Sequence, residues 1–156
     1  MKRRFAFLSV LLAVAVLVSG CVYMPGLFTK RARTTGIVEN KTYEVSGFTG
    51  LTLEGYMEDV VLDISRGDFG LQIETDSGYL DELDVEVRGK TLRIAADERL
   101  HMKRMLRINI SAPNIDVLTL RGGLHVVNQR PFAGEKIEIF ASGALEADLN
   151  LDYDEA

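Results

Sequence analysis

The feature that most constrains this chain is an alternation of apolar and polar residues that begins near Tyr43 and continues toward the carboxyl end. Successive side chains of a β-strand point to opposite faces, so a period of two indicates strands with one buried face and one solvated face. The predicted inward positions are Leu51, Leu53, Val60, Leu62, Ile64, Phe69, Leu71, Ile73, Leu83, Val85, Val87, Leu92, Ile94, Leu106, Ile108 and Ile110. The predicted outward positions are Thr52, Asp63, Gln72, Glu74, Asp84, Glu86, Arg93, Arg107 and Asn109.

Turn-forming residues separate the alternating runs at intervals of about ten residues. The predicted turns are Gly55, Arg66-Gly67-Asp68, Asp76-Ser77-Gly78, Gly89-Lys90 and Ala112-Pro113-Asn114. Gly89-Lys90 stands between two alternating runs and predicts a two-residue hairpin turn. One short helical piece, about one turn long, is expected from Gly78 to Leu83.

A repeat near the carboxyl end refines the predicted architecture. The segment 120–126 aligns with 141–147 at an offset of 21 residues, with apolar positions and a glycine in register. Such an offset is typical of stacked β-coils, so we predict an all-β, right-handed β-solenoid-like domain of stacked short strands. The alternative is an antiparallel β-sandwich. Gly55 precedes Gly122 by 67 residues, which is not a multiple of 21, so the first half is irregular or differently wound.

The amino end has the pattern of an export signal. Lys2-Arg3-Arg4 precedes an apolar run from Phe5 to Val18, which is too short to span a bilayer but suits a cleavable signal. Leu17-Val18-Ser19-Gly20-Cys21 resembles the bacterial lipobox. We therefore predict a signal peptide over residues 1–20, cleavage between Gly20 and Cys21, and a diacylglyceryl group on the Cys21 thiol.

The single cysteine supports this interpretation, because it cannot form an internal disulfide and lipidation explains an exported thiol. The alternative is an uncleaved anchor that continues through Val22 to Met24. Ser19, Gly20 and Pro25 disfavour it, since they suit the end of a retained helix poorly. Val22 after the cysteine favours the outer membrane, with the domain periplasmic or surface-exposed, because similar lipoproteins stay at the inner membrane mainly when aspartate stands there.

Charge and composition limit the partners. Residues 1–20 hold three of the 18 cationic residues and none of the 23 anionic ones, so the mature chain has a formal charge of −8. An acidic chain is not expected to bind nucleic acid, because nucleic-acid phosphates are bound by clustered Lys and Arg. Residues 21–40 are expected to form a tether, in which Lys30-Arg31-x-Arg33 is a solvated charge run or rests on lipid headgroups. After the tether, residues 41–156 are expected to form a single domain.

Several segments resemble the head GIN-domain family of autotransporter adhesin heads, over about residues 41–151. The resemblance is carried by 45–55, Asp59-Val60, 83–94, Leu118-Thr119-Leu120 and Ser142-Gly143-Ala144. It implies a β-rich domain with coil-like repeats around a Ser-Gly-x-Gly-Asp pattern. Here Leu124 and Leu145 replace the second glycine and Arg121 replaces the first serine. Family members usually continue through further repeats, so the chain is expected to be short or truncated.

Candidate catalytic and metal-binding groups are few. His101-Met102-x-x-Met105 could hold a soft metal such as Cu(I), but Arg99, Lys103 and Arg104 favour a plain loop. Asp81-Glu82-x-Asp84-x-Glu86 lacks the loop spacing of a calcium site. Carboxylates are plentiful, and Glu58-Asp59, expected in a turn, with the outward Asp63 form the nearest cluster that could act on a polysaccharide; the alternative is solvated acids that keep a sheet soluble. His125 is expected on the surface without a partner. No cofactor is predicted.

These observations predict a non-enzymatic, lipid-anchored cell-envelope protein that presents a β-surface to a protein or glycan partner. One alternative is a β-solenoid enzyme of envelope polysaccharides that uses Asp59 or Asp63. Another is a scaffold whose open end, near Leu149 and Leu151, docks on an envelope protein. An uncapped end also predicts end-to-end self-association through unpaired backbone groups.

Overall fold

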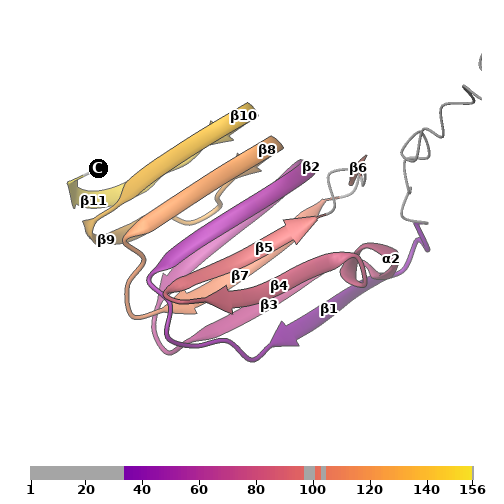
Figure 1. The fold of residues 1–156 in the computed structure, drawn as a ribbon, viewed down its shortest axis with the longest axis horizontal. Coiled ribbons are helices and arrows are strands. Elements are labelled where there is room, and N and C mark those ends of the chain that lie inside the picture. Colours follow the sequence, from indigo (N-terminus) through magenta and orange to yellow (C-terminus); the bar gives the residue numbers. More distant parts are fainter. Residues whose placement is uncertain (1–33, 97–100, 103–104, 156) are drawn as a thin grey trace, which may run out of the picture.

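The computed structural model describes residues 34–96, 101–102 and 105–155, which fold into strands with one short helix (Figure 1). The elements are β1 (Val38–Tyr43), β2 (Gly50–Arg66), β3 (Gly70–Asp76), α2 (Ser77–Leu80), β4 (Leu83–Arg88), β5 (Thr91–Ala96), β6 (His101–Met102), β7 (Leu106–Ala112), β8 (Val117–Val127), β9 (Phe132–Lys136), β10 (Glu138–Asp148) and β11 (Leu151–Glu155). The predicted all-β class is confirmed.

The larger sheet has nine strands and is mixed. Its central strand, β2, lies parallel to β5, β6, β7 and β8, whereas β1–β3, β3–β7 and β4–β5 are antiparallel pairs. β10 adds to β8 in parallel, and β11 pairs with β9 in a separate two-stranded sheet. A purely antiparallel sandwich therefore does not describe the domain. A solenoid winding of the whole domain remains a prediction.

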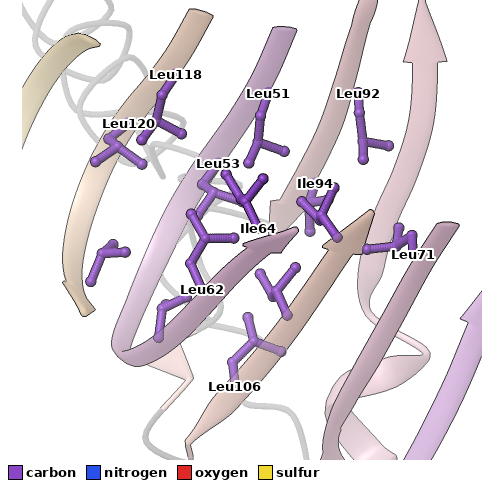
Figure 2. Close-up of a cluster of buried hydrophobic side chains, with 14 of the residues drawn as sticks. Leu51, Leu53, Leu62, Ile64, Leu71, Leu92, Ile94, Leu106, Leu118 and Leu120 are labelled. Atoms are coloured by element: carbon purple, nitrogen blue, oxygen red, sulfur yellow. The ribbon is translucent and has the colours of Figure 1, made fainter. Parts of the chain in front are cut away.

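The sheet curls around its core because β2 is long and its two halves pair with different strands. Residues 50–54 pair with β5, and residues 60–66 pair with β7. Leu51 and Leu53 on the first half, and Leu62 and Ile64 on the second, turn toward a common interior (Figure 2). Burial of each such side chain contributes roughly 1.5–3 kcal/mol. The core thus holds the two halves of β2 together.

The predicted 21-residue repeat is confirmed as a structural register. Every residue of β10 lies beside the residue of β8 that precedes it by 21 positions, from Glu138 beside Val117 to Asp148 beside Val127. β2 stacks on the other side of β8, with Leu53 beside Leu120 and Gly55 beside Gly122. The offset of 67 therefore does not separate the first half from the repeat: the residues between Gly55 and Gly122 include β5, β6 and β7, which pair with β2 in the same sheet.

Three glycines with positive φ angles lie side by side on β2, β8 and β10. We call Gly55, Gly122 and Gly143 the glycine column; their φ angles are 130°, 114° and 106°. A Cβ on Gly122 would overlap the carbonyl of Gly55, and a Cβ on Gly143 would overlap that of Gly122. The prediction of a turn at Gly55 is wrong, because the strand continues through it.

The structure confirms two further local predictions and corrects a third. Gly89-Lys90 joins β4 and β5, which pair from Arg88 beside Thr91, so the predicted hairpin is confirmed. The predicted helical turn is α2, which begins at Ser77. Phe69 was predicted to face the core but is 38% exposed, with its ring centroid 5.1 Å from that of Phe48, which occupies the core instead.

The amino end of the described chain is fastened by one buried carboxylate. Asp76 accepts hydrogen bonds from the backbone N–H groups of Thr35 (2.9 Å), Gly36 (2.7 Å) and Gly78 (3.0 Å). The hydrogen bond from the Thr35 backbone is the largest cause that lowers the pKa of Asp76, and the bonds from Gly36 and Gly78 lower it further. Burial of the carboxylate raises the pKa, but the hydrogen bonds outweigh it and the pKa is about 2. β1 begins at Val38, three residues before the predicted domain start at residue 41, so the sheet includes the last residues of the predicted tether.

The glycine column gives a first prediction about stability. Gly122→Ala should lower the free energy of unfolding by about 3 kcal/mol or more, since the added Cβ meets backbone at a left-handed φ. Gly89→Ala is the matched control: Gly89 also has positive φ, but nothing lies near its Cβ position, so a loss of about 1 kcal/mol is expected. Urea unfolding measures both, and equal losses would contradict the column's role.

Candidate functional site

A concave surface lies just beyond the glycine column, where three parallel strands run side by side. β2, β8 and β10 place Tyr56 beside Gly123 and Gly123 beside Ala144. A groove of about 600 Å³ follows these rows. We call it the corner groove, and its lining residues are Tyr56, Glu58, Gly123, Leu124, His125, Ala144, Leu145 and Glu146.

An aromatic ring and two leucines form the apolar part of the corner groove. The Tyr56 ring lies over Gly123: a Cβ on Gly123 would be 2.5 Å from Tyr56 Cδ1. Tyr56 is 39% exposed, whereas Leu124 is buried and Leu145 packs partly against the core. A flat ring beside apolar surface suits stacking against a sugar or contact with a protein side chain.

The polar part of the corner groove is mainly acidic. Glu58 and Glu146 line it, and Asp59 Oδ1 lies 3.5 Å from Nδ1 of His125. The prediction that His125 has no partner is therefore wrong. Asp59 and His125 are both well exposed, so solvent screens this contact and its effect on stability is small. Glu58 and Asp59 lie within β2, at the register shift between Met57 and Val60, and not in a turn as predicted.

Asp63 belongs to a different place and has a structural role. It was predicted to face outward, yet it is only 4% exposed. The backbone N–H groups of Gln129 and Arg130 donate to its Oδ1 at 3.0 and 3.2 Å, and Nη2 of Arg130 lies 3.9 Å from Oδ2. The connection between β8 and β9 thus covers the face of β2 that alternation alone assigns to solvent. Asp63 holds that connection and is separate from the corner groove.

A second prediction separates the two acids. Asp63→Ala should lower the free energy of unfolding by about 1–2 kcal/mol, because two partly buried hydrogen bonds to the β8–β9 connection are lost. Asp59→Ala, at an exposed position on the same strand, should change it by less than about 0.5 kcal/mol. Thermal or urea unfolding distinguishes them. If Asp63→Ala proved as neutral as Asp59→Ala, the anchoring role would be wrong.

The remaining candidate metal groups are not gathered into a site in the part of the chain that the structure describes. Asp84 and Glu86, from the calcium candidate, face Arg93, whose Nη1 is 2.7 Å from Asp84 Oδ2 and 3.3 Å from Glu86 Oε1. Glu54 completes this network, 3.1 Å from Arg93 Nε. Within residues 34–96, 101–102 and 105–155, no group of three or more His, Cys, Asp or Glu side chains could hold a metal ion.

The soft-metal candidate lies partly on β6. The backbone of His101 and Met102 pairs there with Tyr56 and Met57 of β2, and Met105 is 51% exposed. The cationic residues expected around this candidate, Arg99, Lys103 and Arg104, lie outside the described residues.

The alternation of the sequence did not reveal the corner groove, although a signal for it was present. An apolar residue stands two positions before each glycine of the column, and another stands two positions after it. The three triplets are Leu53-Gly55-Met57, Leu120-Gly122-Leu124 and Ala141-Gly143-Leu145. Aligning all three on their glycines, instead of on a fixed spacing, brings Tyr56 beside Gly123 and His125 beside Glu146.

The predicted lipid-attachment site is outside the described part of the chain. Gly20 and Cys21, and the basic run Lys30-Arg31-x-Arg33, precede residue 34, where the described structure begins. Among the residues described, none belongs to a helix with the length and apolar character that crossing a membrane requires. Processing at Gly20-Cys21 thus stays a prediction.

A curled, mixed all-β sheet defines the structural class, and comparison with known proteins identifies the family. The chain belongs to the family described as "Putative auto-transporter adhesin, head GIN domain", whose profile matches residues 47–156. The resemblance found in the sequence is confirmed. A comparison with curated protein sequences finds no match.

Solved structures share the fold. A crystal structure named "Putative lipid binding protein", from Parabacteroides distasonis, has a TM-score of 0.64 and 20% identity over 80% of this chain and 54% of its own. A "putative adhesin" from Bacteroides fragilis has a TM-score of 0.61 and 18% identity over 79% and 57%. The chain thus spans little more than half the length of these proteins. Neither the family nor these neighbours are named as enzymes.

Proposed function

We propose that this protein is a lipid-anchored, non-catalytic module of the cell envelope that binds a protein or glycan partner through the corner groove. The observation that carries the proposal is the groove itself: an exposed aromatic ring, two leucines and two acids lie along three strands whose register the glycine column fixes. Binding sites combine apolar surface with a few fixed polar groups in this way.

The position of the tether supports this role. Cys21 lies 14 residues before Thr35, where the chain first bonds to Asp76, so the tether reaches about 45 Å when extended. β1, which follows it, is at one end of the strand order and is separated from β2 by β3 and β7, whereas β8 and β10 branch off from β2 (Figure 1). The strands that form the groove therefore lie across the sheet from the attachment point. The adhesin-like family also supports a location at the cell envelope.

A polysaccharide-cleaving enzyme was the alternative, and the structure weakens its residue set. Asp63 is engaged with the β8–β9 connection, so the acids left are Glu58 and Glu146 in the groove and Asp59 beside His125. Glycosidases need a pair of carboxyl groups set on either side of the scissile bond. The groove also contains Tyr56, Leu124 and Leu145, and this apolar surface is what favours holding a ligand.

The lipid anchor gives a third prediction. Mass spectrometry of the amino terminus of the mature protein should find a diacylglyceryl group on Cys21, and Cys21→Ala should leave a soluble or unprocessed chain. A single acyl chain anchors weakly, so the full lipid is expected to be required for stable membrane retention. Wild-type protein recovered from the membrane with its starting methionine and no lipid would contradict the anchor.

The corner groove gives a fourth prediction. Mature protein should bind an envelope polysaccharide or envelope protein in a surface-immobilised assay, and Tyr56→Ala should weaken that binding about tenfold or more because the central ring is lost. Gln72→Ala, at an exposed position of β3, is the control and should bind normally. Release of reducing ends from the polysaccharide, abolished by Asp59→Asn, would instead establish the enzyme.

A further inference from the structure

A second pocket, of about 170 Å³, lies where three connected parts of the chain meet. They are the end of β2, the connection between β7 and β8, and the connection between β8 and β9, and one side chain of β11 joins them. Its polar lining residues include Arg66, Asn114, Arg130 and Tyr153, and we call it the arginine pocket. It shares no residue with the corner groove.

The charge of the arginine pocket is opposite to that of the corner groove. Two arginines line it, and none of the described residues that line it is Asp or Glu. The corner groove instead contains two glutamates, and the chain as a whole is acidic. Two guanidinium groups in one concave site attract an oxyanion, because hydrogen bonds between ionised groups are stronger than neutral ones.

Arg66 is held in place and still has donors to offer. Its Nε donates to the backbone carbonyl of Pro113 at 3.1 Å, which fixes the guanidinium against the β7–β8 connection. No carboxylate of the described residues forms an ion pair with Arg66. Its two Nη groups can therefore bind an oxyanion through two parallel hydrogen bonds, the geometry that a planar guanidinium favours.

Two acids contact the lining residues, and both are already engaged. Asp63 accepts two backbone N–H groups through Oδ1, and its Oδ2 is as far as 3.9 Å from Nη2 of Arg130. Asp116 accepts a hydrogen bond from Nδ2 of Asn114. Neither acid lines the pocket, so they offset its positive charge only in part.

Tyr153 forms an aromatic wall of the same pocket. Its ring lies where a Cβ on Gly134 would stand, and its hydroxyl lies 3.4 Å from the carbonyl oxygen of Ile115. Burial is the main cause that raises the pKa of Tyr153; Asp116 raises it further, and Arg66 lowers it. The positive charge of Arg66 therefore acts at this ring. Since a water molecule occupies about 30 Å³ in the liquid, the pocket has room for one small charged group and part of a sugar ring.

We propose that the arginine pocket binds a single oxyanionic group, a phosphate or a carboxylate, through the guanidinium groups of Arg66 and Arg130. Arg66 supplies the directed pair of hydrogen bonds, Arg130 adds charge, and Tyr153 forms the wall beside the bound group. This site goes beyond the proposed binding function, because it gives the domain a second ligand contact of opposite charge to the first.

The test uses the mature protein and two probes, inorganic phosphate and glucuronate, added at constant ionic strength in chloride. Amide chemical shifts report binding, and residues 112–115 and 129–131 should shift in a saturable way with each probe that fits. Arg66→Gln should weaken binding about tenfold or more. Arg66→Lys keeps the charge but loses the planar fork, so it should bind between wild type and Arg66→Gln.

Arg121→Gln is the matched control, since it removes an exposed arginine of β8 that does not line the pocket, and it should bind both probes normally. Binding of phosphate alone supports a phosphorylated ligand such as a lipid headgroup, and binding of glucuronate alone supports an acidic sugar. Absence of saturable shifts, equal binding of neutral glucose, or equal weakening by Arg66→Gln and Arg121→Gln overturns the proposal. Tyr56→Ala should leave anion binding unchanged, so failure of the corner groove is distinguishable from failure of this pocket.

Discussion

The close approach of backbone to backbone at the glycine column is the constraint on which the rest of the structure depends. Gly55, Gly122 and Gly143 come from three strands and lie side by side. Because a side chain at any of them would occupy the space of a neighbouring carbonyl or strand, the column fixes the register of β2, β8 and β10 together. A one-residue slip would also turn the inward leucines toward solvent, so packing and backbone sterics favour the same alignment.

This register determines what the surface offers. The Tyr56 ring can lie close to Gly123 only because that position has no side chain, and the same alignment sets His125 beside Glu146. The bulge between Met57 and Val60 shifts Glu58 and Asp59 relative to β8, which places Asp59 against His125. The corner groove is therefore a consequence of how the strands turn, and its binding residues are held by strands and not by mobile loops.

Sequence periodicity predicted most strands, the hairpin at Gly89-Lys90 and the 21-residue register, because each of these depends on local alternation or on a repeat. It misplaced Asp63, since five consecutive residues from Val60 to Ile64 are buried where the β8–β9 connection covers the second face of the strand. It also took Gly55 for a turn. A glycine in a strand has the same local signature whether the chain reverses or only bends, and the distinction lies in what packs beside it.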